Sequence, residues 1–174
     1  MDLALRALSG EGGPGLLHYA AEIDDKGESK GLQIKMTRVL FQHIRVLPEE
    51  QQTDIIWKGD STGATAAHWA AQSGAIFLLQ ELLDEKSVQL SQEGNALDRK
   101  DNNNETPLYW AALAGRFECA AYLIERGASV NTVSAETGFT PLHAATANKH
   151  GLLMGLLIDH VRDRYFLSLK ELTV

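Results

Sequence analysis

The segment Asp101–Gly115 reads DNNNETPLYWAALAG, and its layout returns twice more along the chain. Asp60–Gly74 reads DSTGATAAHWAAQSG, and Ala135–Gly151 reads AETGFTPLHAATANKHG. The threonines that align are Thr65, Thr106 and Thr140, 41 and 34 residues apart. A weaker copy lies upstream in Gly13–Ala21, GPGLLHYAA. Repetition at such a period indicates one supersecondary unit copied along the chain, with insertions where the spacing is uneven.

Each copy carries the start and stop signals of two short helices. Thr106 suits a helix N-cap, and Pro107 suits the first helical position, where no amide hydrogen bond is lost. Gly115 and Gly127 then end a first and a second helix, because glycine adopts the positive φ of a helix C-terminus at little cost. The turn before the first helix carries a residue that tolerates left-handed backbone, namely Gly13, Gly63, Asn104 or Gly138. The predicted unit is a β-turn followed by two antiparallel helices.

These motifs resemble those of the ankyrin-repeat family. Thr140–Ala145, TPLHAA, matches the T-P-L-H-x-A signature fully. Thr106–Ala111 differs from it only at Tyr109, whereas the copy that begins at Thr65 lacks the proline and the leucine. Leu123–Asn131, LIERGASVN, is similar to the family's L-L-x-x-G-A-D-V-N. The resemblance implies an all-α fold, an ankyrin-repeat solenoid of stacked helix-turn-helix pairs with short β-turn or hairpin connections.

We expect a single ankyrin-repeat array over residues 1–174. Its parts are a degenerate N-terminal repeat over 1–58, repeats near 60–100, 101–134 and 135–161, and a C-terminal capping helix over 161–174. The cap is inferred from apolar residues that continue at helical spacing, Val161, Tyr165, Leu169 and Leu172. Alternatively, this segment begins a larger protein cut at Val174.

Two inserted loops are expected at 24–31 and 84–94, where charged and glycine-rich sequence favours solvated chain. Between them, a second helix is predicted from about Leu32 to Leu47. A short extra helix is predicted from Pro48, with acidic residues in its first turn.

Composition excludes several classes of protein. The net charge of -7 argues against a nucleic-acid binder, because phosphate contacts need clustered Lys and Arg. The single cysteine, Cys119, favours a reducing compartment, so we expect a cytoplasmic location. No apolar run reaches membrane-spanning length, and the first residues lack the layout of a signal peptide. We expect a monomer with no cofactor, no membrane insertion and no nucleic-acid partner.

The candidate chemical groups favour structural roles over catalysis. His18, His68 and His143 recur at one repeat position, which indicates hydrogen bonding to backbone groups of neighbouring loops. Cys119 is predicted to be a buried small residue in a helix. The ligand types at His150, Asp159, His160 and Asp163 fit no known zinc spacing, so no metal site is predicted. Gly10–Gly15 matches G-x-G-x-x-G only formally, because no strand precedes it.

An aromatic residue follows the histidine position in three copies, at Tyr19, Trp69 and Trp110. We favour packing between repeats for these rings. The alternative is that their edges reach the concave face and anchor a partner.

The family resemblance implies a non-catalytic module that binds another protein through the concave side of the stack. Carried over by position, the predicted partner-binding residues are Ser61, Thr62, Trp69, Gln72, Asn102, Asn103, Glu105, Trp110, Leu113, Glu136, Thr137, Phe139 and Asn148. An alternative is that the chain is the targeting or substrate-recruiting N-terminal segment of a larger protein, such as a bacterial effector delivered into the cytosol of a host cell.

Overall fold

The computed structural model describes residues 14–23, 28–84 and 96–171, and the elements in these ranges are helices. Most of them form four consecutive pairs. The pairs are α2 (Leu16–Glu22) with α3 (Glu28–Ile44), α5 (Ala66–Ser73) with α6 (Ile76–Leu82), α8 (Pro107–Ala114) with α9 (Phe117–Glu125), and α10 (Pro141–Ala147) with α11 (Gly151–Glu171). The predicted all-α array of helix pairs is confirmed.

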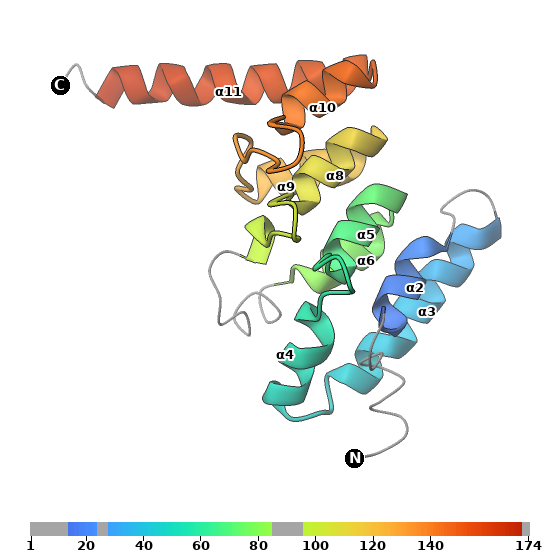
Figure 1. Ribbon diagram of the computed structural model, residues 1–174. Helices are drawn as coiled ribbons and strands as arrows, with labels where there is room; N and C mark the ends of the chain where they lie inside the picture. Colours follow the sequence, from blue (N-terminus) through green and yellow to red (C-terminus); the bar gives the residue numbers. More distant parts are fainter. Residues whose placement is uncertain (1–13, 24–27, 85–95, 172–174) are drawn as a thin grey trace.

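Successive pairs stack side by side in chain order (Figure 1). The first helices contact one another in the order α2, α5, α8 and α10, and the second helices in the order α3, α6, α9 and α11. We number these pairs as repeats 1 to 4. One pair has too few side chains to enclose a core, so the contacts between repeats supply most of the burial.

The turns and caps follow the signals in the sequence. The backbone takes a positive φ at Gly63 (77°), Asn104 (62°) and Gly138 (71°), as the alignment of the copies predicts. The hydroxyls of Thr106 and Thr140 accept hydrogen bonds from the third residue of α8 and of α10. These turns bring the chain into each first helix with the same geometry.

Small residues let the first helices lie close together. Ala70, Ala71, Ala111 and Ala112 are fully buried between layers. Leucines of the second helices, at positions such as Leu78, Leu79, Leu82 and Leu123, fill the space behind them. Each fully covered leucine stabilises the stack by about 1.5–3 kcal/mol.

A further helix, α4 (Glu49–Trp57), stands between repeats 1 and 2. It confirms the short helix predicted from Pro48, which is its N-cap, with Glu49 and Glu50 in the first turn. Ile55, Ile56 and Trp57 join the common core. The 3-10 turn η1 (Ala96–Asp98) precedes repeat 3.

The bounds of α3 differ from the prediction. The helix begins at Glu28 and ends at Ile44, so residues 28–31 are helical rather than part of a loop. Burial of Gln33, Thr37 and Phe41 gives α3 an inner face that helical propensity alone did not reveal. Residues 24–27 of the first predicted loop, and 85–94 of the second, lie outside the described residues.

The predicted capping segment over 161–174 is helical through Glu171, and it forms one unbroken helix, α11, with the second helix of repeat 4 from Gly151 (Figure 1). In repeat 3, Gly127 stops the chain after α9 with a φ of +93°. The aligned position of repeat 4 is Val161, a β-branched residue that cannot take this conformation cheaply. The helix therefore runs on past the length of its counterpart α9.

Candidate protein-binding surface

The hairpin turns of repeats 2 and 3 are each built around one aspartate. Asp60 Oδ1 accepts hydrogen bonds from the backbone N–H groups of Thr62 (2.8 Å) and Ala64 (3.1 Å). Asp101 Oδ1 accepts from the N–H groups of Asn103 and Glu105, both at 2.9 Å. These bonds hold each turn rigid, and a rigid support suits side chains that bind a partner.

The second carboxylate oxygen of each aspartate holds a tryptophan of the same repeat. Trp69 Nε1 donates to Asp60 Oδ2 at 2.9 Å, and Trp110 Nε1 donates to Asp101 Oδ2 at 3.1 Å. Burial alone would raise the pKa of Asp60, but the hydrogen bonds from Thr62, Trp69 and Ala64 hold it below its usual value. This pairing was not predicted, although its signal is present in the sequence, where an aspartate lies nine residues before a tryptophan in both repeats.

Neighbouring hairpins are joined through their main chains. The N–H of Asn102 donates to the Thr62 carbonyl at 2.9 Å, and the N–H of Ala135 donates to the Asn103 carbonyl at 2.7 Å. The Asn103 side chain adds a hydrogen bond from Nδ2 to Glu136 Oε2 at 3.0 Å. The hairpins of repeats 2 to 4 therefore form one continuous ridge. We call this ridge, with the exposed side of α5, α8 and α10, the hairpin face.

Two of the three repeated histidines, His18 and His68, connect one layer to the next as predicted, whereas the bonds of His143 go to Thr140 of its own repeat. In repeat 2, His68 Nδ1 accepts from the Thr65 N–H, and Nε2 bonds the Glu105 carbonyl of repeat 3, both at 3.1 Å. His18 makes the same bonds to Gly15 and to Ala64. Burial lowers the pKa of His68 to about 4 and also lowers the pKa of His18. Both imidazoles are therefore neutral at neutral pH.

Most of the predicted partner-binding residues lie exposed. They are Ser61, Thr62, Gln72, Asn102, Asn103, Leu113, Glu136, Thr137, Phe139 and Asn148. Two of them are apolar, Leu113 and Phe139, each 41% exposed. The Phe139 ring stacks on His143 with centroids 5.7 Å apart. The hairpin face thus offers two apolar anchors among amide, hydroxyl and carboxylate groups.

The prediction that Glu105 is an exposed partner-binding residue is wrong, because its side chain is buried. Glu105 Oε1 accepts a hydrogen bond from the hydroxyl of Ser134 at 2.8 Å. Ser134 takes the place of Asp60 and Asp101 in the hairpin of repeat 4, because its N–H bonds the Phe139 carbonyl and its carbonyl accepts from the Gly138 N–H. An aspartate there would face the carboxylate of Glu105, whereas a serine hydroxyl donates to it. Burial raises the pKa of Glu105.

Of the three aromatic residues, two pack between repeats and one is exposed. Trp69 and Trp110 are half-buried and pack on the core, which agrees with packing between repeats. Their rings lie edge-on to the histidines of the preceding repeats, His18 and His68, with centroids 6.2 and 5.5 Å apart. Tyr19, in the first repeat, is 52% exposed.

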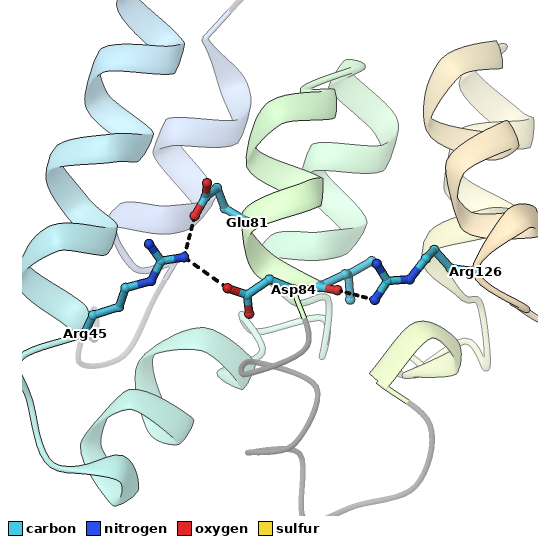
Figure 2. Close-up of polar contacts among 5 residues, drawn as sticks. Arg45, Glu81, Asp84 and Arg126 are labelled. Carbon is cyan, nitrogen blue, oxygen red and sulfur yellow. Dashed lines mark hydrogen bonds and ion pairs between the residues drawn. The ribbon is translucent and has the colours of Figure 1, made fainter.

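The second helices carry another set of links near their C-terminal ends (Figure 2). Arg45, just after α3, bonds Glu81 at 2.8 Å and Asp84 at 3.0 Å at the end of α6. From repeat 3, Arg126 donates to the Leu83 carbonyl at 2.9 Å. Neighbouring repeats are therefore linked at the ends of their second helices as well as at their hairpins, which keeps the hairpin face in a fixed shape.

The remaining chemical candidates have structural positions. Cys119 is buried in α9, with its Sγ 3.8 Å from the Ala70 carbonyl. Within the described ranges, no three His, Cys, Asp or Glu side chains gather as metal ligands would. Gly15 is the N-cap of α2, and residues 10–13 of the glycine run lie outside the described residues. In the same ranges, no helix has the length and apolarity needed to cross a bilayer.

Comparison with known proteins gives consistent matches. A family model of ankyrin repeats in three copies matches residues 12–134 and 87–165. Rabankyrin-5 of Mus musculus is 36% identical over 103 residues, which cover 56% of this chain and 9% of that protein. Palmitoyltransferase Hip14 of Drosophila melanogaster is 36% identical over 81 residues, covering 47% of this chain and 12% of that protein.

A third relative is the 26S proteasome non-ATPase regulatory subunit 10 of Dictyostelium discoideum, 32% identical over 83 residues, or 48% of this chain and 35% of that protein. The chain thus spans a minor part of the length of each of these three relatives. Its family model nevertheless covers most of the described repeats, with their threonine-capped helices and joined hairpins. The chain belongs to the ankyrin-repeat family.

Proposed function

We propose that this chain binds a partner protein through the hairpin face. Ankyrin repeats are non-catalytic modules that mediate protein–protein interaction. The observation that carries the proposal is the exposure of Leu113 and Phe139 on the hairpin face, whose ridge has its main chain fixed by hydrogen bonds between hairpins. A rigid surface loses little conformational entropy on binding, and exposed apolar anchors supply the affinity.

The polar groups around the anchors suggest the character of the partner. Asn102, Thr137 and Glu136 offer amide, hydroxyl and carboxylate groups, and the whole chain carries a net charge of -7. A partner that inserts apolar side chains and carries a positive charge beside them fits this surface best, because opposite charges speed encounter and fix register. A typical complex of this kind buries about 1,200–2,000 Å² in total.

The test compares matched variants in partner capture from cell extract, followed by affinity measurement with the captured protein. Phe139→Ala and Leu113→Ala each remove an anchor, and Val46→Ala truncates a side chain that is 80% exposed just after α3, away from the hairpin face. We expect each anchor variant to weaken binding at least about tenfold. The Val46 variant should bind like the natural chain. Equal affinity in all three would place the binding site elsewhere.

A second proposal concerns the context of the module. The curated relatives are much longer than their match to this chain, which covers 9% of Rabankyrin-5 and 12% of Hip14. This favours a role as the targeting or substrate-recruiting segment of a larger protein, including an effector that a bacterium delivers into a host cell. We place its action in the cytoplasm, or in the host cytosol for an effector. Sequencing the reading frame beyond Val174 tests this role, since an immediate stop codon argues against it.

A further inference from the structure

Two junctions of the stack use one repeated pair of contacts. Between repeats 1 and 2, His18 Nε2 bonds the Ala64 carbonyl at 3.1 Å, and the edge of Trp69 lies against the imidazole. Between repeats 2 and 3, His68 makes the same contacts with the Glu105 carbonyl and Trp110. In each case the earlier repeat gives the histidine, and the later repeat gives a carbonyl and an aromatic ring.

The two ends of the stack each carry one half of this pair. His143 in repeat 4 is exposed, whereas His18 and His68 are 2% and 0% exposed. Tyr19, at the position of Trp69 and Trp110, is 52% exposed. The end of repeat 4 therefore offers a histidine, and the end of repeat 1 offers an aromatic ring beside the carbonyl of Pro14, the residue that aligns with Ala64 and Glu105.

His143 is already set in the orientation that the pair requires. Its Nδ1 accepts from the Thr140 N–H at 3.3 Å, as His68 Nδ1 accepts from Thr65. An N–H group only donates, so the remaining proton of the neutral ring is on Nε2. This Nε2–H can donate to a backbone carbonyl that approaches from beyond repeat 4.

Apolar side chains are exposed at both ends as well. Ile158 in α11 is 48% exposed, whereas its aligned counterparts Leu83 and Ile124 are 0% and 5% exposed under the following repeat. On α3, the side that faces α6 holds Arg38, which stacks over Phe77. The opposite side of α3 exposes Leu32, Met36 and Val39 at helical spacing.

Within the described residues, no fifth hairpin covers the end of repeat 4. The helix continues through Glu171 instead of stopping where α9 stops, so the described chain does not turn back to place a fifth hairpin against α10. The face that fits the end of repeat 4 is the start of repeat 1 of a second copy, because it continues the same interface that joins the inner repeats.

We propose that copies of this chain associate head to tail, repeat 4 of one copy stacking on repeat 1 of the next. His143 Nε2–H of the first copy donates to the Pro14 carbonyl of the second, and its imidazole meets the edge of that copy's Tyr19. Such a contact joins different faces, so it forms rings or open chains of copies rather than a two-fold symmetric dimer. This departs from the monomer that the sequence led us to expect, and it does not depend on the proposed partner binding.

Two variants block one end each. His143→Glu removes the donor and brings a negative charge toward the carbonyl, yet it keeps the helix start, because threonine with glutamate three residues later is a favourable capping box. Tyr19→Glu puts a charge on the exposed face of repeat 1. Gln80→Glu is the control, since it adds the same charge to an exposed position of α6 in the middle of the stack, outside the predicted partner-binding residues.

The measurement is sedimentation equilibrium from about 10 μM to about 1 mM, where interfaces of modest area associate. We expect the mass of the natural chain and of Gln80→Glu to rise with concentration beyond that of a dimer. Each end variant alone should stay monomeric, with an unchanged circular dichroism spectrum. An equimolar mixture of the two end variants should form dimers and stop there, because only one pair of intact faces remains.

Three results would overturn the proposal. The natural chain could keep the mass of a monomer over the whole range. The end variants could associate as strongly as the natural chain, which would place the contact elsewhere. The mixture of folded end variants could stay monomeric, which would show that the two ends do not fit each other.

Discussion

His68 Nε2 lies 3.1 Å from the carbonyl oxygen of Glu105, thirty-seven residues later in the chain. The other ring nitrogen accepts from the Thr65 N–H, so one imidazole satisfies backbone groups of two successive repeats. A carbonyl only accepts and an amide N–H only donates, which requires the neutral ring with its proton on Nε2. The stack therefore depends on an uncharged imidazole, although the ordinary pKa of histidine lies near physiological pH.

Acidification should weaken the fold through this histidine. The folded pKa of His68, about 4, lies below the ordinary value of 6.5, so the unfolded chain takes up the proton first. Stability is then fully present above about pH 6.5 and falls as the pH drops toward 4. Between about pH 7.5 and about pH 5, the free energy of unfolding should fall by about 2 kcal/mol from His68. The lowered pKa of His18 adds a loss of the same sign.

Denaturant titration at the two pH values measures this loss. His68→Gln should be less stable than the natural chain at the higher pH and should lose less on acidification. His143→Gln is the matched control, because this histidine is exposed. An acid-induced loss of the same size in His68→Gln would refute the assignment.

Gly115→Ala should destabilise the chain by more than the strain of a positive φ alone would cause. The backbone at Gly115 has a φ of +69°, and a Cβ there would lie 2.5 Å from Cε1 and Nδ1 of His150. Gly127→Ala is the control, because its φ is +93° but no described atom lies within 4 Å of the added Cβ. We expect a loss of about 1 kcal/mol for Gly127→Ala and about 2–3 kcal/mol for Gly115→Ala in thermal unfolding. Adding His150→Ala to Gly115→Ala should reduce the difference, and an equal loss in both single variants would contradict the steric explanation.

Glu105→Lys should unfold the chain more easily rather than only alter its surface. The side chain is buried and accepts a hydrogen bond from Ser134, so a lysine would leave a buried cation without this contact. We expect a loss of about 2–4 kcal/mol in chemical denaturation. Glu105→Gln keeps an acceptor of the same shape and should cost less than about 1 kcal/mol. If the Glu105→Lys chain is as stable as the natural chain, Glu105 is not buried and can bind a partner, as the sequence predicted.

Lys149→Gly should stabilise the chain. Lys149 occupies, in repeat 4, the left-handed position that glycine fills at Gly74 and Gly115, with a φ of +61°. Glycine relieves the strain between Cβ and the backbone there, which is worth about 0.5–1 kcal/mol. Asn104→Gly is the comparison, because this asparagine also has a positive φ but donates to the Val133 carbonyl at 2.7 Å. The Asn104→Gly variant should be no more stable than the natural chain. A loss of stability in Lys149→Gly would contradict the prediction.

The repeat register was predictable because its signals are local. Threonine caps, prolines and left-handed turn residues act within a few positions, and they place the starts of α8 and α10 at Pro107 and Pro141 as observed. The exposure of Leu113 and Phe139 also followed from their place in the repeat.

What the sequence did not reveal depends on contacts between repeats. The burial of Glu105 arises from a serine twenty-nine residues later, which no local pattern relates to it. The free ends at Tyr19 and His143 became visible only when their buried counterparts in the inner layers were compared. The helix α11 is unbroken because repeat 4 has no glycine at the position of Gly127. The absence of such a glycine does not predict where a helix ends. Whether the exposed residues contact a partner stays a prediction.

Cys119 gives this molecule an internal reporter. It is the only cysteine of the chain, and its sulfur lies against the Ala70 carbonyl at the junction of repeats 2 and 3. A thiol reagent can reach it only when these layers part or the chain unfolds, so the rate of alkylation counts such opening events. The natural protein can therefore show, without an engineered label, whether a bound ligand closes the middle of the array.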